Sequence, residues 1–476
     1  MTQAAQARPT YLLGAGFSKA VSHAMPITNE LGASLGDRLA NEIGFELRPG
    51  QTFEDWLTLQ VTPLPFLQGF ENSRRAADAS RVIAEIATVL DLALERAAAD
   101  AAPPWLLQLI ALWHAERAAV LTFNYDTLIE RGVNTLAPTS TSRDGSVGFI
   151  QGDEVVFPAP PAPSAQFLGD SGVGYSGESF QLLKLHGSLA WYWGSGDATG
   201  STLVRLREKH VLGRAEPLAA EADFAGATKL DRYIIPPVTS KDGYYSSYLA
   251  NAIWRDARSQ ISTATSLTLI GYSLPHEDRV ASELVAQLPD TAPVTVVDRD
   301  PGTVNQRPSV LANLRRLGID PASAIGGEDC VERFVAAKLH SAISTLPAAD
   351  AFDELENPNA DVVVAVSQGW GHQNRGDLYV LVWNESNGTF EAHGVPSTAR
   401  QGSSMPYRES VLNSMPSGHR RLGDFVTAAR LRAHIQDGAA FRFTLPMAGR
   451  TAVGIGVRRL KAERWEILGM QWAPSP

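Results

Sequence analysis

The sequence predicts an α/β protein with a parallel sheet, followed by a smaller α+β domain. Over roughly the first 300 residues, short apolar runs typical of strands buried on both faces alternate with segments of helical spacing. Beyond residue 360, apolar and polar residues alternate instead, as they do in half-buried antiparallel strands. Together these patterns predict a Rossmann-like parallel sheet with a helical insertion, and then a separately folded unit.

The predicted strands of the first domain are apolar runs that end in glycine, proline or polar turn residues. They are TYLLGAGFS (10–18), AAVLTFNYD (118–126), FQLLKLHGS (180–188), SLTLIGYS (266–273) and APVTVVDRD (292–300), while RYIIPPVTS (232–240) is a short strand or an extended segment. Helical spacing of apolar residues predicts helices over 28–44, 75–99, 247–262 and 276–288.

Shifts in composition divide the rest of the chain. A helical insertion is expected at about 45–117, and a loop-rich insertion with room for one hairpin at about 137–180. The acidic segment 346–360 is typical of a linker, which puts the first domain at 1–345 and the second, of no recognised family, at 361–476. The expected elements of the second domain are five strands, DVVVAVSQ, DLYVLVWNES, FRFTLP, TAVGIGV and WEILGMQW, and one helix over 421–436.

Charge and cysteine content exclude several kinds of protein. The net charge of −10 argues against binding nucleic acid or anionic lipid through bulk electrostatics. No apolar stretch approaches the roughly 20 residues that span a bilayer, and the N-terminus lacks the pattern of a signal peptide. Cys330 is the one cysteine in the sequence, so an internal disulfide and a cysteine-based zinc site are both excluded. We therefore expect a cytoplasmic protein.

Polar residues follow five of the predicted strands. These are Gly14–Ser18, Asn124–Asp126, His186–Ser188, Gly271–Ser273 and Asp298. Because ligands of open parallel sheets bind at the carboxyl ends of the strands, we expect these residues to share one site.

The turn GAGFS (14–18) places two glycines where a strand passes into a helix. Without side chains there, a pyrophosphate can approach the backbone amides and the helix N-terminus. A tight turn needs glycine as well, so this alternative stays open. The full G-x-G-x-x-G pattern is absent, since positions 19 and 20 are Lys19 and Ala20.

The other strand ends also allow two interpretations each. Asn124 and Asp126 could point into one pocket, or form a turn that caps the next helix. Asp298 could accept hydrogen bonds from a ribose, or be a solvated loop carboxylate. His186 could be a general base or a packed core residue.

In order along the chain, these segments resemble the sirtuin-like family. The family signs are a GAG-x-S turn, a T-x-N-x-D segment, a K-L-H-G segment, a G-[TY]-S strand end and a later acidic strand end. They stand here at Gly14–Ser18, Thr122–Asp126, Lys184–Gly187, Gly271–Ser273 and Asp298, and the match spans about residues 10–305.

The details are most similar to the bacterial branch that hydrolyses NAD+ in antiphage defence, as in Thoeris and related abortive-infection systems. Two departures separate the chain from the protein deacylases. The four-cysteine zinc module is absent, and Phe123 stands where the deacylases usually carry glutamine. The resemblance implies that NAD+ is the substrate and that no metal is needed.

The resemblance also implies a role for each site residue. Asn124 would hold the ribose hydroxyls or the attacking water, Asp126 would contact the carboxamide or brace the loop, and His186 would be the general base. Phosphate would lie against Gly14, Ala15, Gly16, Phe17 and Ser18, and the adenosine half against Gly271, Ser273 and Asp298.

Two other functions stay open. The chain could be a sensor that binds NAD+ or ADP-ribose without turnover, or an NAD-dependent protein deacylase. An NAD+ hydrolase has to be restrained, so we expect a homo-oligomer whose 361–476 domain takes part in assembly or in recognition of a trigger. A partner defence protein or a phage-derived molecule would supply that trigger.

Overall fold

A computed structural model describes most of residues 7–344 and seven strand segments beyond them. The described residues are 7–39, 42–43, 45, 47–136, 139–141, 147–157, 166–168, 179–194, 202–206, 208–215, 230–238, 245, 247–275, 277–303, 309–344, 361–370, 374–384, 389–395, 425–426, 440–447, 450–459 and 464–474. The chain forms two compact units. The first comprises 1–103, 117–131 and 152–334, and the second 104–116, 132–151 and 335–476.

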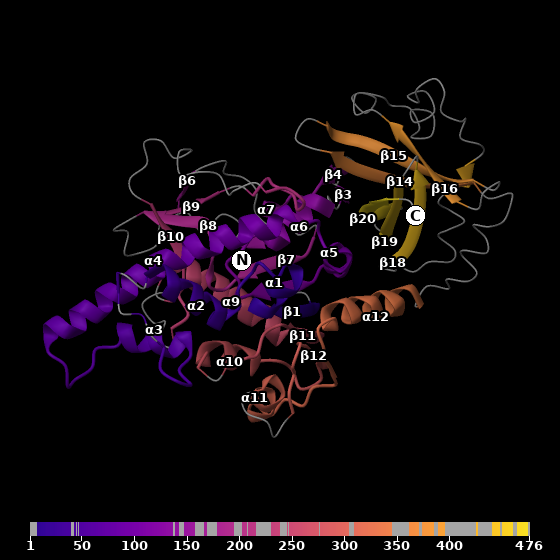
Figure 1. Ribbon diagram of the computed structural model, residues 1–476. Coiled ribbons are helices and arrows are strands. Elements are labelled where there is room, and N and C mark those ends of the chain that lie inside the picture. Colours follow the sequence, from indigo (N-terminus) through magenta and orange to yellow (C-terminus); the bar gives the residue numbers. More distant parts are fainter. Residues whose placement is uncertain are drawn as a thin grey trace. The chain divides into compact units, whose positions relative to one another are not determined.

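A parallel sheet of seven strands is the centre of the first unit (Figure 1). Its strands are β1 (Pro9–Leu13), β2 (Ala119–Thr122), β5 (Val156–Phe157), β7 (Gln181–Lys184), β11 (Ser266–Ile270), β12 (Val294–Val297) and β13 (Ser323–Ile325). They lie in the order β13-β12-β11-β1-β2-β7-β5, and every neighbouring pair is parallel. All four residues of both β2 and β7 are buried, including the polar residues Thr122, Gln181 and Lys184.

The strand order confirms the Rossmann-like α/β fold. Leaving out the edge strand β5, the strands lie across the sheet in the order β7, β2, β1, β11, β12, β13. Numbered along the chain, this is the order 3-2-1-4-5-6 of the dinucleotide-binding fold. The order reverses between β1 and β11, so the switch point of the sheet lies between these two strands. The connecting helices are α1 (Ala15–Val21), α6 (Leu128–Leu136), α7 (Gly152–Val155), α9 (Tyr248–Ser262), α10 (Arg279–Val285) and α11 (Val310–Arg316).

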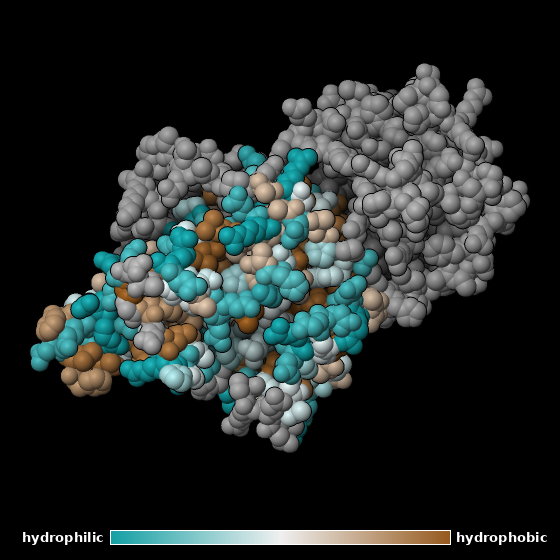
Figure 2. Space-filling view, in the orientation of Figure 1, coloured by the Kyte–Doolittle hydropathy of each residue, from teal (hydrophilic) through white to brown (hydrophobic). Residues whose placement is uncertain are grey.

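The helical insertion begins after α2 (Thr28–Leu39) and contains α3 (Phe53–Val61) and α4 (Gly69–Ala99). Thr52 and Asp55 begin α3 with a capping box. The 31 residues of α4 make it about 45 Å long, and Figure 1 shows it reaching past the sheet beside α3. Figure 2 shows apolar surface at the far end of this pair, where Phe66 is 78% and Phe70 74% exposed.

A mixed sheet, in which β6 and β9 pair parallel and the other neighbours antiparallel, continues from the parallel one. Its strands are β6 (Gln166–Leu168), β8 (Gly187–Gly194), β9 (Thr202–Arg205) and β10 (Leu230–Ile234), in the order β10-β8-β9-β6. Because β7 ends at Lys184 and β8 begins at Gly187, His186 lies in the turn between the two sheets.

The second unit contains helix α5 (Pro104–Glu116), the hairpin of β3 (Thr139–Thr141) and β4 (Val147–Phe149), and most of α12 (Cys330–Ser344). Besides this hairpin, its described strands form two sheets, β16-β15-β14-β17 and β18-β19-β20. They are β14 (Asp361–Trp370), β15 (Asn374–Asn384), β16 (Thr389–Val395), β17 (Phe425–Val426), β18 (Ala440–Met447), β19 (Arg450–Arg459) and β20 (Arg464–Pro474). As the alternating pattern predicts, β14–β15, β15–β16, β18–β19 and β19–β20 pair antiparallel.

Several predicted elements have other limits. The helix expected over 28–44 ends at Leu39, and the one expected over 75–99 begins at Gly69. Of the helix expected over 421–436 the structure describes two residues, Phe425 and Val426, and they are strand β17. The linker 346–360 lies outside the described residues, and the domain limits 1–345 and 361–476 stay predictions. None of the described helices is long and apolar enough to cross a bilayer.

Candidate active site

The switch point is built from glycines that pack against one another. A Cβ on Gly14 would lie 2.6 Å from the Gly271 carbonyl oxygen, and a Cβ on Gly16 would lie 2.8 Å from Gly271 Cα. Gly271 has φ of +59°, which favours glycine. The turns after β1 and β11 therefore approach as closely as they do because neither carries a side chain.

Three of the amides expected to bind phosphate have partners inside the protein. Gly14 N donates to Ile270 O at 3.1 Å, Gly16 N to Gly271 O at 3.0 Å, and Phe17 N to Gly14 O at 2.9 Å. Ala15 is half-buried, and its amide has no such bond among the described residues. The alternative of a glycine-dependent turn thus has a physical basis here, and phosphate binding by Gly14–Ser18 stays a prediction.

Asn124 is joined to α1 by hydrogen bonds that orient its amide. Its Nδ2 donates to Gly14 O at 2.8 Å and to Ser18 Oγ at 2.7 Å, while Ser18 Oγ donates to Asp126 Oδ2 at 2.6 Å. Since Ser18 gives its one proton to the carboxylate, it has to accept from Asn124. Asn124 Oδ1 accepts no hydrogen bond from the described residues, and the half-buried side chain can present this oxygen to a ligand.

Asp126 is buried and has two structural partners. Besides the bond from Ser18, its Oδ1 accepts from Leu128 N at 3.1 Å, which caps the start of α6. These contacts support the bracing role expected for Asp126. Contact with a carboxamide stays a prediction.

His186 lies among aromatic rings and is only 6% exposed. Its ring centroid is 4.8 Å from that of Phe123 and 6.4 Å from that of Tyr125, whose ring is inclined by 29° to the imidazole. The His186 carbonyl accepts from Ile235 N at 2.8 Å, which ties the turn to the segment after β10. His186 and Asn124 follow neighbouring strands, because Lys184 of β7 is paired with Thr122 of β2.

Two further aromatic residues complete this surrounding of His186. Trp254 of α9 has its ring 6.5 Å from that of His186, and its Nε1 donates to Leu185 O at 3.2 Å. Tyr272 stacks on Phe123 at 4.5 Å and donates to Asp278. Burial raises the pKa of Tyr272 well above its ordinary value of 10.0, so its phenol stays protonated. Trp254 was not identified from the sequence, because a tryptophan in a helix is typical of any core.

Ser273 and Asp298 lie on the other side of the switch point. Ser273 is exposed, and its carbonyl accepts from Asn313 Nδ2 of α11 at 3.1 Å. Asp298 is half-buried, and its Oδ1 accepts from Asp300 N at 2.9 Å. Burial raises the pKa of Asp298 from its ordinary 3.8. All the predicted site residues thus follow the strands β7, β2, β1, β11 and β12, which are consecutive in the sheet.

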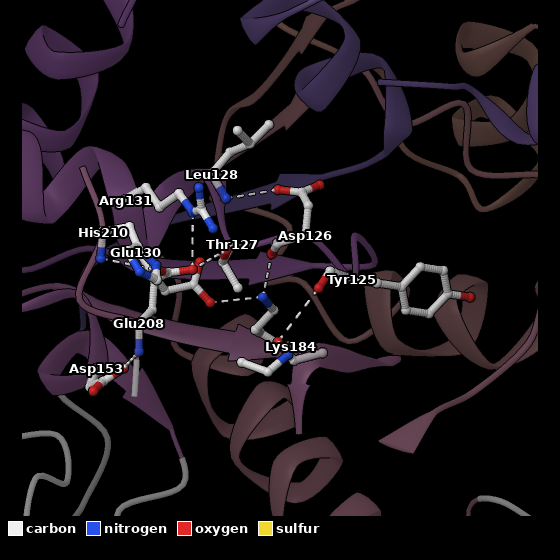
Figure 3. A network of polar contacts seen from close by, with 12 residues as sticks. Tyr125, Asp126, Thr127, Leu128, Glu130, Arg131, Asp153, Lys184, Glu208 and His210 are labelled. Carbon is white, nitrogen blue, oxygen red and sulfur yellow. Dashed lines mark hydrogen bonds and ion pairs between the residues drawn. The ribbon is translucent and has the colours of Figure 1, made fainter. Parts of the chain in front are cut away.

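A buried network of charges supports the loop after β2 (Figure 3). Lys184 Nζ is 2.7 Å from Glu130 Oε1, and Arg131 Nε is 3.0 Å from Glu208 Oε2, with all four side chains at most 4% exposed. His210 Nδ1 lies 2.8 Å from Glu208 Oε1. Burial raises the pKa of Glu130, whereas for Glu208 the contacts of His210 and Arg131 outweigh burial and lower the pKa. The sequence analysis assigned no role to these residues.

No protein-family model matches this chain, and no curated protein sequence is significantly similar to it. Among the residues that the structure describes, no group of three or more His, Cys, Asp or Glu side chains is placed to hold a metal ion.

Proposed function

We propose that the unit around the seven-stranded sheet binds NAD+ and hydrolyses its nicotinamide–ribose bond, as a sirtuin-like NAD+ hydrolase. The observation that carries the proposal is that two features lie together at the carboxyl ends of the parallel strands. Glycine turns line the switch point of a Rossmann strand order, and Asn124 and His186 follow the next two strands.

The site residues can divide the reaction between them. In the proposed step the bond from the nicotinamide nitrogen to ribose C1′ breaks, and nicotinamide leaves as a neutral molecule. A water oxygen bonds to C1′, and its proton passes to His186, giving ADP-ribose. Asn124 Oδ1 is the acceptor for the ribose hydroxyls or the water, because its amide nitrogen is held by Gly14 O and Ser18.

The aromatic surroundings of His186 favour this chemistry. A positively charged nicotinamide ring and an oxocarbenium-like ribose are both attracted to the faces of aromatic rings. Phe123 and Trp254, whose rings lie beside that of His186, would limit the water molecules that reach the reacting carbon.

The direct test is mass spectrometry of NAD+ incubated with the full-length protein. We expect nicotinamide and ADP-ribose in equal amounts, and loss of both with Asn124→Ala or His186→Ala. Each variant should unfold at nearly the wild-type temperature. A loss of roughly 2–5 kcal/mol on removing the His186 ring would mark it as a core residue instead.

Binding of NAD+ without turnover would replace the hydrolase by the sensor. The assay is therefore repeated at several protein concentrations, and with extracts of phage-infected cells, because we also propose an antiphage role with activation by assembly or a trigger. The protein would be a sensor if NAD+ stays intact under all of these conditions while calorimetry shows NAD+ binding that Asn124→Ala abolishes.

A further inference from the structure

Lys184 is placed to hold the Asn124 loop against the strand that leads to His186. It is the last residue of β7, only 1% of its side chain is exposed, and its Nζ donates to the main-chain carbonyl of Asp126. The same Nζ is 2.7 Å from Glu130 Oε1 in the first turn of α6 (Figure 3). One buried ammonium thus contacts the loop after β2 and the helix that follows it.

Two ties between this loop and the strands β7 and β8 are bonds from backbone amides, and Ser188 Oγ of β8 also lies 3.5 Å from Tyr125 O. Leu185 N donates to Thr122 O at 2.9 Å, and Leu189 N donates to Tyr125 O at 2.8 Å. Backbone amides are present whatever the side chains are. At the Asp126 carbonyl, by contrast, the bond depends on a lysine at position 184.

We infer that Lys184 is a positioning residue for the proposed reaction: through the Asp126 carbonyl it sets where Asn124 lies relative to His186. This inference rests on the proposed hydrolase function. Glu130 has the separate task of balancing the charge of Lys184. Its Oε2 is buried without a hydrogen-bond partner among the described residues, so the carboxylate uses one oxygen for this pair.

A pair of variants can distinguish the positioning of the loop by Lys184 from the charge balance provided by Glu130. Glu130→Gln keeps the bond from Lys184 to the Asp126 carbonyl, and because it leaves the buried Lys184 charge without its partner, we expect this variant to lose stability. Lys184→Met, combined with Glu130→Gln so that no unpaired charge stays buried, keeps the chain length and removes the donor. Since the predicted adenosine contacts lie beyond β11 and β12, the double variant should keep its KM.

The experiment measures kcat and KM for NAD+ in the full-length wild type and both variants. We expect Glu130→Gln to keep kcat within about threefold, and the double variant to lose about 100-fold in kcat, a loss of the size that a misplacement of about 1 Å causes. KM should change less than threefold in both. Equal losses of kcat in the two variants, or an unchanged kcat in the double variant, would overturn the inference.

Hydrogen exchange of the amides in 123–128 provides a readout that does not need turnover. These amides should exchange faster in the double variant than in Glu130→Gln when both are compared well below their unfolding temperatures. If the wild type leaves NAD+ intact, the hydrolase proposal fails while this comparison still decides the role of Lys184. Equal exchange in both variants would show that Lys184 does not order the loop.

Discussion

Replacing Gly271 by alanine should damage the switch point more than any comparable glycine substitution at an open turn. Gly271 has φ of +59°, and a Cβ there would lie 2.3 Å from Phe17 N and 2.4 Å from Gly16 C. Both neighbours are backbone atoms, so no side chain can rotate to make space. The turn after β11 has to move away from α1.

The expected loss of unfolding free energy in Gly271→Ala has two parts, one from the backbone conformation and one from crowding. A left-handed backbone costs about 1–2 kcal/mol for a residue with a Cβ. Crowding a packed site costs about 1–3 kcal/mol more. Gly318 is a matched control, because it has φ of +77° and a Cβ there would meet nothing within 4 Å. Gly318→Ala should therefore show only the cost of the left-handed backbone.

Denaturant unfolding of both variants measures the difference. With an unchanged m value, the midpoint of Gly271→Ala should fall below that of Gly318→Ala by an amount equivalent to about 1–3 kcal/mol. Equal midpoints would refute the reasoning, since they would mean that the two turns do not approach each other as closely as Gly14, Gly16 and Gly271 indicate.

Three further outcomes follow from the site. Asp126→Ala should lose about 1–2 kcal/mol of stability in denaturant unfolding, because α6 loses its cap; no loss would contradict that capping role. Glu208→Gln should cost about 3–5 kcal/mol near pH 7 by breaking the buried pair with Arg131. The folded-state pKa of Glu208 is lowered from 4.5, so its contribution is present above about pH 4.5 and is lost as the pH falls through the folded value. The difference in unfolding temperature between the wild type and Glu208→Gln should therefore be smaller at pH 3 than at pH 7. An equal difference at both pH values would contradict this role of Glu208. Asp298→Ala should weaken NAD+ binding measured by calorimetry with little change in kcat, and an unchanged affinity would place Asp298 outside the site.

Local pattern in the sequence was enough to predict the strands and the polar residues that follow them. A buried parallel strand is a run of apolar residues, and its end is marked by the first glycine or polar residue after it. For that reason TYLLGAGFS, AAVLTFNYD, FQLLKLHGS and SLTLIGYS were identified within a few residues of β1, β2, β7 and β11. The helix limits were less well predicted, since α4 extends six residues before the expected start at position 75, to Gly69.

Only the tertiary structure decided which of these ends meet and how each polar atom is used. Gly14 lies beside Gly271, and Ser18 donates to Asp126, across more than 100 residues of sequence in both cases. Such partners depend on strand order and register, which periodicity does not encode. Ser18 and the amides of Gly16 and Phe17 therefore turned out to have partners inside the protein.

The buried charges show most clearly which features the sequence predicts and which only the tertiary structure decides. In the sequence, Lys184 is a polar residue at the end of an apolar run, and Glu130 is one of the 51 acidic residues of the chain. Their pairing needs β7 to lie next to β2 in a register that aligns Lys184 with Thr122. A charge is buried at a cost unless its partner is in place, so the sequence could specify the two residues while only the folded sheet could bring them together.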